Sequence, residues 1–318
     1  MSSEAQFPMK AYVARQSEAR LDRFAYQLSR GGKSTDPGTV HDLRVSIRRY
    51  ESCIKAFDGF FAARPVRKFH NRLAEVLKPA GLVRDRDIAV GLALEAGLSR
   101  DTPLIAALSR QRKGLAKSLS EEVKRWTKRH PSDKWRRRLA ATLNDDTHSA
   151  KSIWYSARTS SENAAAVLPK IAKDFFRRGR KIVQPETPDK KLHRFRLRAK
   201  RFRYTLELFK PCYGPILSEH IAAVKRMQDQ LGTMNDCAAT LDLIAASDLA
   251  DLDGAQQLRD YLEYRSQLER THFFEYWQST FGSGEAEKRW MDYLERFAGR
   301  VAKSQLQNAV ATATRMLA

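Results

Sequence analysis

The chain has 318 residues, of which 42% are hydrophobic and 30% are charged. This apolar fraction excludes an intrinsically disordered chain, and no run approaches the roughly 18 consecutive apolar residues of a transmembrane helix. Lys and Arg total 58 against 37 Asp and Glu, so the formal net charge is +21 and the pI is near 10.1. Such an excess of cations predicts a polyanionic partner, and charge alone leaves nucleic acid, an anionic membrane surface and a phosphate polymer open.

The three cysteines are odd in number and far apart, at Cys53, Cys212 and Cys237. None belongs to a C-x-x-C pair or has metal-ligand spacing to a histidine, so we expect small core residues of a reduced protein and no metal or cofactor. The N-terminal residues MSSEAQFPMK lack the cationic start and apolar run of a signal peptide. The sequence therefore predicts a cytoplasmic protein without membrane insertion.

Apolar residues recur at helical spacing along nearly the whole chain, and glycines or prolines separate the periodic runs. Runs of alternating apolar and polar residues, typical of strands, are absent. The sequence thus predicts an all-α fold of about ten to twelve helices. The expected helices cover residues 9–30, 40–57, 65–79, 82–97, 101–126, 132–144, 162–180, 190–209, 215–231, 233–250, 254 to beyond 277, and 285–317.

One segment of the chain occurs twice. Residues 40–57 align without a gap with residues 192–209, at a fixed offset of 193 − 41 = 152. The repeat predicts two pseudo-symmetric helical bundles over residues 9–146 and 160–305, followed by a helix end or tail over residues 306–318. The aligned pairs of basic residues are His41 with His193, Arg44 with Arg196, Arg48 with Lys200, and Arg49 with Arg201.

The repeated segment predicts a cationic stripe on each of two helices. Because a helix turns by about 100° per residue, His41, Arg44 and Arg48 fall on one narrow stripe, opposite the apolar positions. One such stripe is compatible with an ordinary solvated face, but its recurrence at equivalent positions favours a binding surface. If a two-fold axis relates the halves, both stripes face a shared groove whose Arg, Lys and His side chains suit phosphate oxygens.

A second feature is repeated further along each half. The segment from Gly81 to Asp85 aligns with that from Gly232 to Asp236, at an offset of 236 − 85 = 151. Glycine at these positions predicts a turn between two helices. Each aspartate then either caps the following helix or orients a basic side chain of the groove, and the sequence leaves both interpretations open.

These landmarks together resemble the CHAD family, the conserved histidine α-helical domain. Each half of that domain has a His-x-x-Arg helix start and a later Gly-x-x-(Arg/Asn)-Asp turn. The resemblance covers residues 9–305 and no Glu-x-Glu-x-Lys motif of an adjoining CYTH domain is present. It implies binding of inorganic polyphosphate in a basic central groove and location at polyphosphate granules. The binding residues it implies are His41, Arg44, Arg48, Arg49, Arg84, His193, Arg196, Lys200, Arg201 and Arg203.

The two copies differ in charge at one position, where Lys55 of the first aligns with Glu207 of the second. We therefore expect a groove whose two halves are unequally charged.

Two other functions remain as alternatives. Nucleic-acid binding suits the net charge, but zinc-finger spacing, basic-zipper heptads and an aromatic ladder for stacking bases are all missing. An enzyme acting on phosphoanhydrides would need clustered carboxylates for a metal or a P-loop, and neither is visible. The sequence predicts a binding protein rather than an enzyme.

Overall fold

The computed structural model describes residues 6–129, 132–143, 152–246, 248–296 and 298. Over these residues the chain forms eleven α-helices and one short 3-10 helix, with no strand beyond a single isolated bridge between Pro8 and Thr159. The predicted all-α fold and its number of helices are confirmed. Among the described helices, none combines the length and apolar character that crossing a membrane requires.

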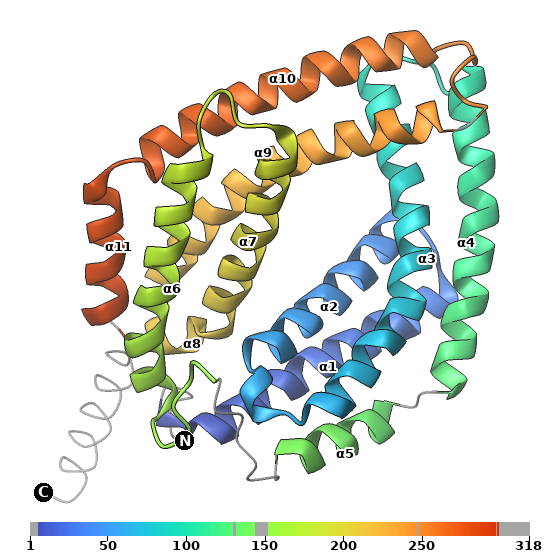
Figure 1. Cartoon of the computed structure of the whole chain (residues 1–318). Coiled ribbons are helices and arrows are strands. Elements are labelled where there is room, and N and C mark those ends of the chain that lie inside the picture. Colours follow the sequence, from blue (N-terminus) through green and yellow to red (C-terminus); the bar gives the residue numbers. More distant parts are fainter. Residues whose placement is uncertain (1–5, 130–131, 144–151, 247, 297, 299–318) are drawn as a thin grey trace, which may run out of the picture.

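The first five helices contact mainly one another. Helix α1 packs on α2, α4 and α5, while α3 packs on both α2 and α4 (Figure 1). A short 3-10 helix, Asp58–Phe60, follows α2. The bounds are α1 Met9–Lys33, α2 Pro37–Ala56, α3 Ala63–Glu95, α4 Pro103–Arg129 and α5 Ser132–Leu143.

The remaining six helices form a second group. Helix α7 packs on α6 and α9, α9 packs on α10, and α11 packs on α6. Between the groups, residues 144–151 of the predicted boundary lie outside the described residues, whereas Trp154 is buried. The bounds are α6 Ser160–Ile182, α7 Asp189–Leu208, α8 Lys210–Tyr213, α9 Ile216–Ala245, α10 Ala255–Thr280 and α11 Gly284–Arg296.

Two predicted helix breaks are wrong. Helix α3 continues through Pro79 and Gly81, and α9 continues through Gly232, so each replaces two expected helices. Proline and glycine disfavour a helix interior, but the cost is small beside the burial of a long apolar face, which includes Val76 and Val83 in α3. The predicted last helix extends to residue 317, but α11 ends at residue 296 and residues 299–318, with the 306–318 tail, lie outside the described residues.

An aromatic cluster joins the two groups where α2 and α7 end. The ring of Phe209 lies 5.9 Å from Phe57, 5.5 Å from Tyr12 and 4.8 Å from Trp154. The Tyr12 hydroxyl donates a hydrogen bond of 2.5 Å to the carbonyl oxygen of Leu208. These four rings are called the aromatic seam below, and they hold the C-terminal ends of α2 and α7 together.

A separate apolar cluster joins the groups elsewhere. Leu92 and Ala93 of α3, with Leu104 of α4, are buried in one cluster with Cys237 of α9 and Leu258 of α10. Helices α2 and α7 thus face each other, as do α3 and α9, in the region between this cluster and the aromatic seam (Figure 1). The three cysteines are buried and none forms a disulfide, as predicted.

Candidate anion-binding site

A cleft of about 380 Å³ lies between α2, α3, α7 and α9. It brings together residues about 150 positions apart in the chain, because α2 and α7 each contribute one end of their basic stripe. We call it the basic cleft. Its charged and imidazole lining consists of Arg44, Arg48, Asp85, His193, Arg196 and Asp236.

The apolar faces of α2 and α7 orient the basic side chains. In α2, Leu43 and Ile47 are fully buried, and in α7 Phe195 and Ala199 are fully buried. Because these residues lie opposite the basic positions of the same helices, burying them turns both stripes away from the two cores. Arg44 and Arg196, each the eighth residue of its helix, both line the cleft, and the C-terminal ends meet in the aromatic seam, so α2 and α7 run side by side in the same direction.

Gly81 makes room for Arg44, whereas Gly232 would tolerate a Cβ at ordinary contact distance from Arg196. A Cβ atom on Gly81 would lie 2.7 Å from Nη1 of Arg44, and one on Gly232 would lie 3.7 Å from Nη2 of Arg196. Arg44 also donates a hydrogen bond of 3.3 Å from Nη1 to the carbonyl oxygen of Leu77. The repeated glycines therefore do not form turns, because Gly81 lies inside α3 and Gly232 lies inside α9.

The aspartates of the repeated motif do not cap helices. Asp85 and Asp236 lie inside α3 and α9, four residues beyond the glycines and so on the same helix face. Both line the basic cleft. Of the two interpretations, helix capping is wrong, and the position beside Arg44 and Arg196 is the one that carboxylates orienting basic side chains would take.

Burial and mutual repulsion perturb the cations of the cleft and Lys200, which does not line the cleft but lies close enough to Arg196 and Arg48 to be repelled by them. Burial, with Arg196 and Arg48 nearby, lowers the pKa of Lys200 to about 7. Burial and the neighbouring Arg48 lower the pKa of Arg44 to about 10, and burial lowers the pKa of Arg196. Partial burial raises the pKa of Asp85 in spite of Arg44. Positive charge thus exceeds negative charge in a poorly solvated space, and a bound anion would relieve the repulsion.

The cleft also contains unused hydrogen-bond donors. Over the described residues, no carboxylate oxygen lies within 4.0 Å of a charged nitrogen of Arg44, Arg48, Arg196 or Lys200. Nε of Arg196 is buried without a hydrogen-bond partner. Unpaired guanidinium groups in partly buried positions are costly, and phosphate oxygens match their geometry.

Besides Lys200 and Arg201, four of the predicted residues lie outside the lining of the cleft. His41 is partly exposed and does not line the cleft, although its partial burial and the nearby Arg84 lower its pKa. Arg84 lies near His41 and does not line the cleft either. Arg49 and Arg203 both contact the carboxylate of Glu207, at 3.4 Å each.

Arg201, the last predicted residue, lines a different pocket between α2, α3 and α7. Sequence reasoning missed Asn235 and Thr240, which line the basic cleft. Asn235 was visible inside the repeated Gly-x-x-Asn-Asp motif, whereas nothing in the sequence indicated Thr240. Within the part of the chain that the structure describes, no three His, Cys, Asp or Glu side chains gather closely enough to hold a metal ion.

Fold and site together define an all-α protein with a cationic cleft between two groups of helices. The chain belongs to the CHAD family, because the family model of the CHAD domain matches residues 15–245. No curated protein sequence matches the chain.

Two solved structures have the same fold. The crystal structure of the CHAD domain from the plant Ricinus communis is 18% identical, with a TM-score of 0.61 over 94% of this chain and 96% of that one. PptA from Streptomyces chartreusis is 16% identical, with a TM-score of 0.59 over 87% of this chain and 100% of that one.

Proposed function

We propose that the basic cleft binds inorganic polyphosphate and that the protein is a binding module, not an enzyme, located at polyphosphate granules in the cytoplasm. The observation that carries this proposal is the set of cations from both helix groups that share one cleft without carboxylate partners. Membership of the CHAD family supports it, since the resemblance to that family implies polyphosphate as the ligand.

The chemistry of the cleft suits a flexible phosphate polymer. Polyphosphate carries about one negative charge per internal phosphate and presents no base edges, so it is recognised by cations in a line. Arg44 and Arg48 on α2 and Arg196 on α7 offer forked donors, and Lys200 adds a point charge. Asp85 and Asp236 attract Arg44 and Arg196 from beyond ion-pair distance and so leave their donors free for phosphate.

Competition separates polyphosphate binding from nucleic-acid binding. Labelled long-chain polyphosphate bound to the protein should not be displaced by DNA or RNA that is in excess when both are counted as phosphate groups, because the cleft offers no surface for stacking bases. The affinity should fall steeply with salt, since binding releases counterions.

In the competition experiment, efficient displacement by DNA would favour the nucleic-acid alternative. Release of orthophosphate from polyphosphate with magnesium or manganese would instead indicate an enzyme.

Replacement of Gly81 by Val should weaken polyphosphate binding without unfolding the protein. A side chain there would push the flexible end of Arg44 out of its position across α3, because even Cβ would come within 2.7 Å of Nη1. We expect a loss of affinity of about tenfold, the cost of one displaced charged contact. Gly91→Val is the matched control on the same helix, where a Cβ meets nothing within 4 Å. Equal losses in both variants would contradict this role of Gly81.

Binding should be linked to proton uptake by Lys200. Its pKa is about 7 in the free protein, and a bound anion must raise that pKa. Above pH 7 the lysine is mostly neutral and gains a proton on binding, so affinity falls with rising pH by at most about tenfold per unit; below pH 7 this dependence disappears. Calorimetry at pH 8 in two buffers of different ionisation heat measures the uptake. Lys200→Arg should bind without it, and equal uptake in that variant would assign the proton to another group.

A further inference from the structure

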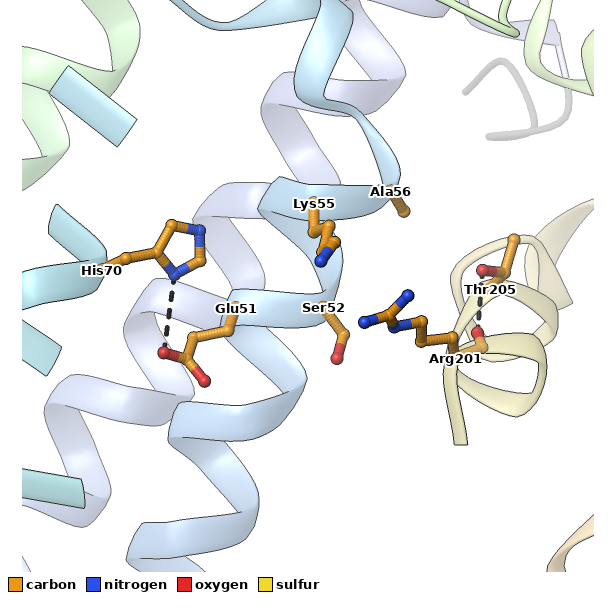
Figure 2. Close-up of a pocket in the computed structure, with 7 residues that line it drawn as sticks. All are labelled: Glu51, Ser52, Lys55, Ala56, His70, Arg201 and Thr205. Atoms are coloured by element: carbon orange, nitrogen blue, oxygen red, sulfur yellow. Dashed lines mark hydrogen bonds and ion pairs between the residues drawn. The ribbon is translucent and has the colours of Figure 1, made fainter. Parts of the chain in front are cut away.

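A second pocket, of about 470 Å³, lies between α2, α3 and α7. Figure 2 shows Lys55 and Ser52 on α2 and the side chain of Arg201 extending toward them from α7. Ser52 and Lys55 follow Arg48 on α2 by one and two turns, and Arg201 follows Arg196 on α7. The pocket thus lies nearer to the C-terminal ends of α2 and α7 than the basic cleft does.

The cations of this pocket are free to bind an anion. Within the described residues, neither Lys55 nor Arg201 has a carboxylate oxygen within 4.0 Å of its charged nitrogens. The one carboxylate in the pocket, that of Glu51, lies 3.5 Å from Nδ1 of His70 on α3 (Figure 2). The Thr205 hydroxyl donates its proton to the carbonyl oxygen of Arg201 at 2.9 Å, which leaves its lone pairs and not its proton toward the pocket.

Just beyond this pocket, the space between α2 and α7 is filled by the aromatic seam. Phe57 follows Lys55 by two residues and packs against Phe209 in the aromatic seam. At the position of α7 that aligns with Lys55, Glu207 forms ion pairs with Arg49 and Arg203, so its single negative charge already offsets part of the charge of these two cations. A phosphate chain lying along both stripes thus meets apolar side chains and an internal ion pair, and the last unpaired cations it reaches are those of Lys55 and Arg201.

We propose that this pocket binds the terminal phosphate of a polyphosphate chain whose internal phosphates lie in the basic cleft, an inference that rests on the proposed function. A terminal phosphate differs from an internal one, because it carries up to a second negative charge above its pKa near 6 and presents three free oxygens. Lys55 and Arg201, which approach from two helices, supply donors for that additional charge. The pocket selects chain ends, while the cleft holds any stretch of the polymer.

The experiment compares long-chain polyphosphate with free ends and the same polymer with both ends blocked as phosphate esters. Wild-type protein should bind the blocked polymer about tenfold more weakly than the polymer with free ends, because the contacts to one charged group are lost. The double variant Lys55→Gln, Arg201→Gln should bind both polymers equally well. The double variant Arg110→Gln, Lys117→Gln removes the same charge from exposed positions on α4, and should keep the tenfold preference.

The outcomes separate this inference from the proposed function. Equal binding of both polymers to the wild type would overturn the end-group pocket and leave polyphosphate binding intact, whereas no binding of either polymer would overturn the proposed function itself. If the variant without Lys55 and Arg201 still prefers the polymer with free ends, the chain end binds elsewhere on the protein, and this result would also overturn the inference. Orthophosphate is the last ligand to compare. If it binds this pocket as tightly as the polymer end does, the pocket is a site for free phosphate and not for the end of a chain.

Discussion

Replacement of Arg44, Arg48, Arg196 and Lys200 together by Ala is expected to lower the affinity for long-chain polyphosphate about a thousandfold. Each of these cations offers a charge-assisted hydrogen bond worth at least about 1 kcal/mol, and four such losses amount to about 4 kcal/mol. The protein should not lose stability, because burial and mutual repulsion already disfavour the charged forms of three of these groups in the free state. Fluorescence anisotropy of labelled polyphosphate measures the affinity, and circular dichroism confirms the helical content.

A matched variant tests whether net charge alone explains the loss. Arg110, Lys113, Lys117 and Arg129 are exposed on α4, and replacing these four by Ala removes the same charge away from the cleft. The affinity of this control should fall only severalfold, through the weaker long-range field. A similar loss in both variants would mean that the general positive field, and not the cleft, binds the polymer. Unchanged affinity in the cleft variant would refute the proposed function.

Phe209→Ala should destabilise the protein by about 3–5 kcal/mol, the usual cost of deleting a buried aromatic side chain. Phe209 is fully buried and its ring contacts Tyr12, Phe57 and Trp154 in the aromatic seam. Because this seam joins the ends of α2 and α7, the cavity would loosen the contact that sets the two stripes side by side. Urea denaturation followed by circular dichroism gives the change in the free energy of unfolding.

Phe209→Leu provides the comparison, because it keeps most of the apolar volume and should cost only about 1 kcal/mol. Below the denaturation midpoint, Phe209→Ala should also bind polyphosphate more weakly than Phe209→Leu, since the cleft depends on the seam for its width. A destabilisation below about 1 kcal/mol for Phe209→Ala would show that the seam contributes little to the fold.

The sequence by itself determined the helical class and the composition of the two stripes. Helical periodicity is a local property, because the spacing of Leu43 and Ile47 against Arg44 and Arg48 specifies which face is buried in any helical setting. The repeated His-x-x-Arg spacing likewise singled out Arg196 as a partner of Arg44, and the structure places both in one cleft.

Only the tertiary structure decided how long α3 and α9 are and which charges pair. Local signals at Pro79 and Gly232 favour breaks, but burial of the apolar faces around them outweighs those local preferences. Asp85 and Asp236 therefore lie in the cleft instead of at helix ends. Glu207 pairs with Arg49, and His193 lines the cleft whereas His41 does not. Both facts depend on distances between helices that no local pattern contains. Coulomb interactions and hydrogen bonds act over a few ångströms of space, and only packing brings residues 150 positions apart within that range.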